Sequence, residues 1–123
     1  MTQQHDNSLE HLQAMICEFS EERDWDQFHN PKDLSISIVL ESTEVLEHFQ
    51  WKNHEEMSKH STDKKDDIGE ELADVLSYLL LLANKLNINL ADAYKDKMKK
   101  NRAKYPIEKS KGNHKKYTEL TGR

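Results

Sequence analysis

Residues 66–86 read DDIGEELADVLSYLLLLANKL, and this stretch decides the fold. On a helical wheel of about 100° per residue its apolar side chains form one stripe, and Glu71 lies on that stripe. The stripe consists of Ile68, Val75, Leu79, Leu82 and Leu86, with Asp74 and Tyr78 on the other side of Glu71. The pattern predicts a long helix whose buried face carries carboxylates at its edge.

Residues 33–51 repeat this design. The segment ESTEVL (residues 41–46) corresponds to ELADVL (residues 71–76), 30 residues further along the chain. Glu41 again lies on an apolar stripe, whose members are Leu34, Ile38, Val45 and Phe49. Residues three apart project from the same helix face, so each helix offers a carboxylate pair. We therefore expect two antiparallel helices that face each other and bring four carboxylates together.

The rest of the chain predicts two further helices. Ser8 and Asn89 are suitable N-caps, and the Tyr105-Pro106 pair ends the last helix. Only three Gly and two Pro occur in 123 residues, which is too few turn residues for an all-β protein. We expect an all-α four-helix bundle with an aromatic connector over residues 23–31 and a polar loop, with at most one helical turn, over residues 53–65. The helices are expected at residues 8–22, 33–51, 66–86 and 89–104.

The length predicts a single domain over residues 1–106. Residues 107–123 contain five Lys or Arg against two Glu and few apolar residues, so we expect a basic, flexible C-terminal tail. A solvated terminus is favoured for this tail over a dedicated binding arm.

Net charge and cysteine content limit the partners. The formal charge of −5 argues against nucleic acid as a partner. The single Cys17 excludes an internal disulfide and fits a reducing cytosol. The first ten residues lack the pattern of a signal peptide, and the apolar run at residues 79–84 is too short to span a membrane. We expect a cytoplasmic protein without a membrane partner, in which histidines in polar surroundings, such as His60, are solvated.

Four clustered carboxylates indicate a metal site. Their mutual repulsion is costly unless they bind a cation or protons, and oxygen ligands favour Mg2+ or Mn2+. Such an ion suits metal-assisted hydrolysis of a phosphoanhydride. A di-iron site needs Glu-x-x-His, whereas Val45 precedes His48 by three and residues 66–86 contain no His. A non-enzymatic helical module with structural carboxylates remains the alternative.

Four segments resemble the MazG-like all-α nucleoside triphosphate pyrophosphohydrolases, and within them the dCTP pyrophosphatase branch. The segments are RDWDQFHNPKDL (residues 23–34), ESTEVLEHFQWK (41–52), EELADVLSYLL (70–80) and KMKKNRAKYP (97–106). The resemblance implies cleavage of a nucleoside triphosphate to monophosphate and pyrophosphate, as a house-cleaning activity on the nucleotide pool. It also implies a four-helix bundle that assembles as a homodimer or a homotetramer (a dimer of dimers).

The resemblance also implies residue roles. Glu41, Glu44, Glu71 and Asp74 would bind Mg2+, for which Mn2+ could substitute. The substrate-binding set would be Trp25, Asp26, Gln27, Phe28, His29, Trp51, Tyr78, Lys97, Asn101 and Arg102. Where the branch has a histidine in the first helix, this sequence has Ile16, so dCTP or a related dNTP is expected and a dUTP-specific or other NTP-specific enzyme is the alternative. Glu47 fits an outer carboxylate, a general base or a surface residue equally well.

A second apolar face supports self-association independently of the resemblance. On residues 33–51 this face is formed by Ile36, Val39 and Leu46, and residues 66–86 add Leu76 and Leu80. A helix in a monomeric bundle needs one apolar stripe, so a second stripe predicts a subunit contact. A helix buried at the centre of the bundle would show the same pattern.

Overall fold

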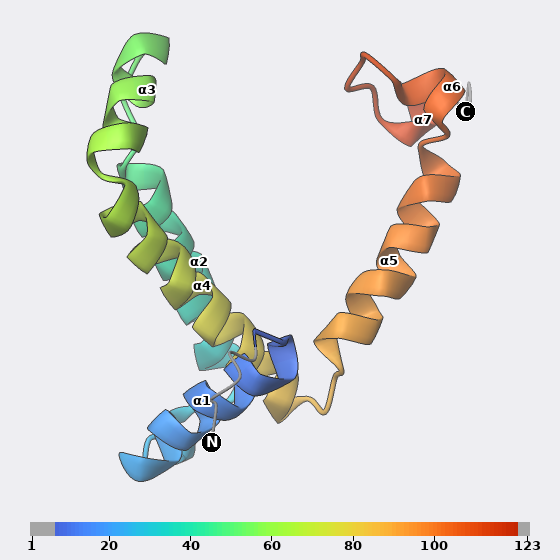
Figure 1. Cartoon of the computed structure of the whole chain (residues 1–123). Coiled ribbons are helices and arrows are strands. Elements are labelled where there is room, and N and C mark those ends of the chain that lie inside the picture. The colour runs from blue at the N-terminus through green and yellow to red at the C-terminus, as the bar shows by residue number, and fades with distance from the viewer. Residues whose placement is uncertain (1–6, 121–123) are drawn as a thin grey trace, which may run out of the picture. The chain divides into compact units, whose positions relative to one another are not determined.

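The computed structural model describes residues 7–120, except for the side chains of residues 117 and 120. All regular elements in this part of the chain are helical, which confirms the all-α class. Two compact units are present, one ending at Ile88 and one beginning at Asn89, and each is described by itself. In chain order (Figure 1) the elements are α1 (Leu9–Glu22), the 3-10 turn η1 (Asp26–Phe28), α2 (Pro31–Glu47), α3 (His54–Asp63), α4 (Lys65–Lys85), α5 (Leu90–Lys104), α6 (Ile107–Ser110) and α7 (Tyr117–Leu120).

Side-chain caps start the helices at the positions that the sequence favours. The predicted caps Ser8 and Asn89 each accept a hydrogen bond from the backbone N–H three residues further on. α2 begins at Pro31, earlier than predicted, because Asn30 caps it and proline suits the first helical position. It also ends earlier, at Glu47, and a turn follows in which Trp51 has a positive φ of 67°.

The polar stretch that was predicted to be a loop over residues 53–65 is largely helix α3, so this prediction is wrong. Its start is a capping box, in which Asn53 accepts from the Glu56 N–H and Glu56 accepts from the Asn53 N–H. The apolar periodicity used to find the other helices is weak here, because α3 is mostly exposed and contains no fully buried residue. The capping signal was present in the sequence but was not used.

α4 is the central helix of the first unit and packs against α1, α2 and α3. The buried core side chains are Leu34 of α2 and Leu80, Leu81 and Ala83 of α4. Leu80, expected on a subunit-contact face, is covered within the chain, and its carbonyl accepts a hydrogen bond from Gln13 of α1. The burial of Leu80 therefore reflects the central position of α4, whereas Leu76 is only half-buried.

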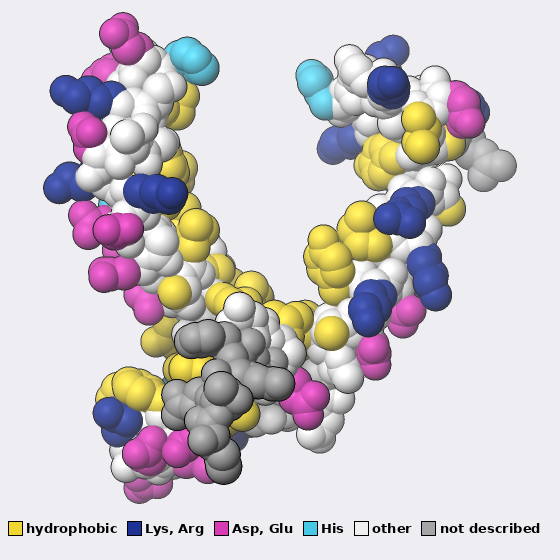
Figure 2. Space-filling view, viewed as in Figure 1, with side chains coloured by type: hydrophobic (Ala, Val, Ile, Leu, Met, Phe, Trp, Pro, Cys, Tyr) yellow, Lys and Arg dark blue, Asp and Glu magenta, His cyan; other side chains and the backbone are white. Residues whose placement is uncertain are grey.

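The second apolar face of α2 remains uncovered in the chain. Ile36, Val39 and Leu46 have exposed fractions of 49%, 63% and 57%. Figure 2 shows hydrophobic side chains along the α2–α4 pair.

None of the helices in residues 7–120 combines the length and apolar character needed to cross a bilayer.

The unit that begins at Asn89 consists of α5 and two single-turn helices. Figure 2 shows Lys and Arg side chains along α5, and no residue of α5 is fully buried. Residues 107–110 and 117–120, within the predicted tail, form α6 and α7. The assignment of residues 1–106 to one domain and 107–123 to a flexible tail stays a prediction.

Candidate active site

The packing of α2 against α4 brings three carboxylates together. One oxygen from each of Glu41, Glu44 and Glu71 lies within 4.8 Å of the other two. Glu41 and Glu44 are three residues apart on α2 and project together, while Glu71 reaches them from the facing helix. This is the juxtaposition that the repeated sequence pattern predicted for these three residues.

The electrostatics of this carboxylate group are unfavourable without a cation. The Oε2 atom of Glu41 is buried and has no hydrogen-bond partner. Burial raises the pKa of Glu41, and a hydrogen bond with Glu44 and the charges of Glu44 and Asp74 raise it further. A hydrogen bond with Glu44 raises the pKa of Glu71 to about 7, with added contributions from burial and from the neighbouring carboxylates. A hard divalent cation would neutralise this repulsion and supply the missing partner of Glu41, so the donor set fits such an ion.

Asp74 lies on α4 three residues beyond Glu71 and connects the carboxylate group to a cavity. Its carboxylate oxygens are outside the group of three within the described residues, yet its negative charge raises the pKa of both Glu41 and Glu71. The cavity beside it has a volume of about 300 Å3. Asp74 therefore lines the cavity and also acts electrostatically on the carboxylate group.

The cavity has an aromatic and apolar wall with a few polar groups, as small-molecule sites usually do. It brings together three residues of the predicted substrate-binding set, Trp25 and His29 from the connector and Tyr78 from α4. Ile16 lies in the same wall. The remaining lining residues are Phe19, Ser20, Ser77 and Leu81.

Ser20 was missed by the sequence reasoning. Its side chain is only 2% exposed and its hydroxyl has no hydrogen-bond partner in the described structure. The signal was available, since Ser20 follows Ile16 by four residues and so falls on the apolar stripe of α1. A hydroxyl on such a stripe needs a partner, which makes it a candidate ligand-facing group.

Other members of the predicted set lie outside this cavity. Asp26 forms an ion pair with Lys85, with Oδ1 and Nζ 2.7 Å apart, and Gln27 donates hydrogen bonds to Asp24. Phe28 and Trp51 are 61% and 92% exposed. Lys97, Asn101 and Arg102 lie on α5, in the unit that begins at Asn89.

A second hollow of about 380 Å3 borders the carboxylate group. Glu44 and Glu71 line it together with Glu47, which places Glu47 beside the acidic group. His48 and His60 also line it, with Nδ1 of His48 and Nε2 of His60 2.8 Å apart. His60 is therefore not simply solvated as expected, and burial, followed by the positive charge of Lys52, lowers its pKa. The pairing depends on α3, which the sequence reasoning did not predict.

Comparisons with known proteins identify a family for this chain. Residues 36–120 match the MazG-like family. The mouse (Mus musculus) protein named dCTP pyrophosphatase 1 is 41% identical over 115 residues, which cover 92% of this chain and 68% of that protein. The human (Homo sapiens) protein of the same name is 40% identical over the same shares. The crystal structure of a pyrophosphatase from Archaeoglobus fulgidus is 40% identical, with a TM-score of 0.76, over 86% of this chain and 99% of the other.

Such relatives favour an enzyme over the alternative of a non-enzymatic helical module, and that alternative is set aside. They agree with the resemblance drawn from residues 23–34, 41–52, 70–80 and 97–106. The chain therefore belongs to the MazG-like family, in its dCTP pyrophosphatase branch, and is a hydrolase of the nucleotide pyrophosphatase class.

Proposed function

We propose that this enzyme is a Mg2+-dependent nucleoside triphosphate pyrophosphohydrolase that converts dCTP or a related dNTP to the monophosphate and pyrophosphate. Mn2+ is the expected substitute for Mg2+. The single observation that carries the proposal is the buried, unpartnered Oε2 of Glu41 within a group of three carboxylates. The names of the mouse and human relatives support dCTP as the first substrate to test.

The proposed metal ligands are Glu41, Glu44, Glu71 and Asp74. A bound Mg2+ would neutralise phosphate charge and make a water molecule more nucleophilic. The carboxylates must be deprotonated to bind it, so the raised pKa of Glu71, about 7, couples metal binding to pH. A protein with a net charge of −5 needs such a local cation to accept a polyanionic substrate.

The base of the nucleotide is proposed to occupy the aromatic cavity. Trp25 and Tyr78 offer faces for stacking, which tolerates different bases. Asp74 borders both the cavity and the carboxylate group, so a base in the cavity directs its phosphates toward the metal ligands. The other proposed substrate-binding residues, which lie outside the cavity lining, are Gln27, Phe28, Trp51, Lys97, Asn101 and Arg102.

In the proposed reaction a water molecule attacks the α-phosphorus. A bond from its oxygen to phosphorus forms, and the bond from the α-phosphorus to the oxygen that bridges the α- and β-phosphates breaks. Pyrophosphate leaves with that oxygen. Glu47 lines the hollow beside Glu44 and Glu71 and is the proposed acceptor of the water proton.

A substrate panel tests the proposal. Purified protein is assayed for pyrophosphate release from each dNTP and NTP, with dUTP included, in Mg2+, in Mn2+ and in EDTA. We expect release that requires the cation and is fastest with dCTP or a related dNTP. Glu41→Gln and Asp74→Asn should abolish release while circular dichroism shows unchanged helix content. The proposal fails if no nucleoside triphosphate is hydrolysed under any of these conditions.

We further propose that the enzyme is a homodimer or homotetramer that acts in the cytoplasm on unwanted nucleotides. The support for self-association is the exposed α2 face of Ile36, Val39 and Leu46. An apolar face of this kind is a common feature of subunit interfaces.

A further inference from the structure

The aromatic cavity depends on a short connector that carries Trp25 and His29. The other walls belong to α1 and α4, whereas this wall is a segment with a single 3-10 turn. Its large side chains are partly exposed, with exposed fractions of 44% for Trp25 and 61% for Phe28. Burial of apolar surface therefore supplies only part of what fixes its position, and specific contacts supply the rest.

Contacts with α1 hold one side of the connector. The Trp25 N–H donates to the Ser20 carbonyl at 2.9 Å. The Trp25 ring packs edge-on against Phe19, with ring centroids 5.7 Å apart. These contacts fix Trp25 relative to α1 but do not determine the distance from the connector to α4.

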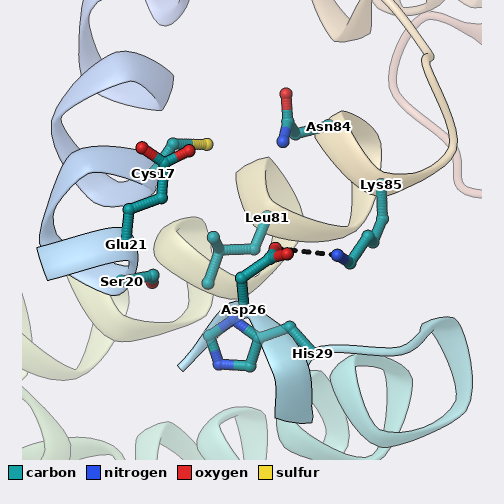
Figure 3. A pocket seen from close by; sticks show the side chains of 8 residues that line it. All are labelled: Cys17, Ser20, Glu21, Asp26, His29, Leu81, Asn84 and Lys85. Atoms are coloured by element: carbon teal, nitrogen blue, oxygen red, sulfur yellow. Dashed lines mark hydrogen bonds and ion pairs between the residues drawn. The ribbon is translucent and has the colours of Figure 1, made fainter. Parts of the chain in front are cut away.

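An ion pair joins the other side of the connector to α4. Nζ of Lys85, the last residue of α4, lies 2.7 Å from Oδ1 of Asp26, the first residue of η1. Figure 3 shows the two side chains reaching toward each other, and 59 residues separate them in the sequence. The contact is short and charge-assisted, with the Lys85 side chain 30% and the Asp26 side chain 64% exposed. Lys85 also holds the pKa of Asp26 below its ordinary value.

Packing behind the connector is incomplete next to the ion pair. A cavity of about 20 Å3, the size of one water molecule, lies among Ser20, His29, Leu81 and the ion pair (Figure 3). Nδ1 of His29 and Oγ of Ser20 are buried there without a hydrogen-bond partner in the described structure. Nδ1 of His29 therefore makes no hydrogen bond to the core within the described residues.

We infer that Lys85 and Asp26 are positioning residues, whose ion pair holds the connector so that Trp25 and His29 form the cavity wall. This inference rests on the proposed function, in which the cavity binds the base of the nucleotide. Asp26 then acts through the connector instead of touching the nucleotide. Neither residue of the pair lines the aromatic cavity.

Steady-state kinetics with the fastest dNTP provide the first test. Lys85→Met should raise KM about three- to tenfold and leave kcat nearly unchanged, because the loss is one of positioning and a partly exposed ion pair is weak. Lys85→Arg should restore KM. The matched control is Lys64→Met, which removes the partner of Asp67 in an exposed pair at 3.9 Å, and its KM should stay within about twofold of wild type. An unchanged KM for Lys85→Met would overturn the inference.

A charge swap separates positioning from direct contact with the nucleotide. The double variant Asp26→Lys with Lys85→Asp keeps the ion pair but reverses its direction, so its KM should recover most of the loss seen in Asp26→Asn and Lys85→Met. If Lys85 or Asp26 touched phosphate or base directly, the swap would be at least as damaging as either single change. That result would contradict the inference.

A measurement without turnover keeps the inference separate from the proposed function. In a Trp51→Phe background Trp25 is the one remaining tryptophan. Adding Lys85→Met should increase acrylamide quenching of Trp25 fluorescence, and adding Lys64→Met should not. If no nucleotide is hydrolysed but quenching rises, the proposed function fails and the positioning role stands. If nucleotides are hydrolysed but quenching and KM are unchanged, the positioning role fails alone.

Discussion

Glu44 and Glu71 share a hydrogen bond between α2 and α4, and this contact is the largest reason that the pKa of Glu71 rises to about 7. Two carboxyl groups can share a hydrogen bond only if one of them keeps a proton. Near pH 7 a cation that binds this site therefore competes with a proton on the carboxylate pair.

Metal-free protein should lose stability as pH rises from about 5 to about 7. The folded pKa of Glu71, about 7, exceeds the usual glutamate value, so the folded state binds the extra proton in this window and stability falls as that proton leaves. Thermal melts in EDTA across this range measure the decline, which should be smaller in Glu71→Gln.

Glu70→Gln, a change of the exposed neighbouring residue, is the control for that experiment. The lowered pKa of His60 acts in the opposite direction, since stability rises with pH as the unfolded His60 loses its proton. The contribution of His60 is the same in wild type, Glu71→Gln and Glu70→Gln, so it cancels when their declines in stability are compared. Equal declines in wild type and Glu71→Gln would contradict the prediction.

Glu41→Gln should stabilise the metal-free protein and remove its response to Mg2+. The amide removes the charge from the buried site of the unpartnered Oε2. Wild type should gain about 2.7 kcal/mol at an ion concentration near 100 times Kd, whereas the variant should gain almost nothing. Differential scanning calorimetry with and without Mg2+ measures both effects, and Glu55→Gln on exposed α3 should respond as wild type does.

Asp74→Asn should shift the pH dependence of metal binding to lower pH. The charge of Asp74 raises the pKa of both Glu41 and Glu71, so its removal makes their protons easier to displace. Loss of the proposed ligand should at the same time weaken metal affinity by at least about tenfold. Isothermal titration with Mn2+ at several pH values measures both quantities. Asp66→Asn, in the first turn of α4, should leave the pH dependence in place.

Trp25→Ala should raise KM by about five- to a hundredfold, the range expected for loss of one stacking contact. Phe28→Ala should have a smaller effect, because Phe28 lies outside the cavity lining and is 61% exposed. Kinetics with one dNTP compare the two variants. A larger effect for Phe28→Ala would place the base elsewhere.

Val39→Asp should dissociate the proposed oligomer without unfolding the chain. Val39 is 63% exposed on α2, so the aspartate is solvated in the monomer but buried in an interface on this face. Light scattering coupled to size-exclusion chromatography measures the mass. Ser58→Asp, which adds the same charge to α3, should keep the wild-type mass. A monomeric wild type would refute self-association.

Much of the fold and part of the site could be predicted from local patterns. Apolar periodicity located α2 and α4, because each of these helices has a stripe that must be buried, and the cap residues Ser8 and Asn89 marked the starts of α1 and α5. The i, i+3 spacing on α2 and α4 predicted the carboxylate group, because residues three apart project from the same helix face. α3 escaped this reasoning, since an exposed helix that begins with the Asn53 capping box has no stripe to detect.

The sequence by itself therefore determined the helical class, the helix caps and the carboxylates that face each other. Only the tertiary structure decided which groups meet across long separations. It covered Leu80 with α1, left the α2 face of Val39 exposed, and joined Asp26 to Lys85. It also left Oε2 of Glu41 and Oγ of Ser20 buried without partners. Periodicity reports which face of a helix is buried, whereas pairing, burial of single atoms and pKa shifts depend on the particular neighbours that packing supplies.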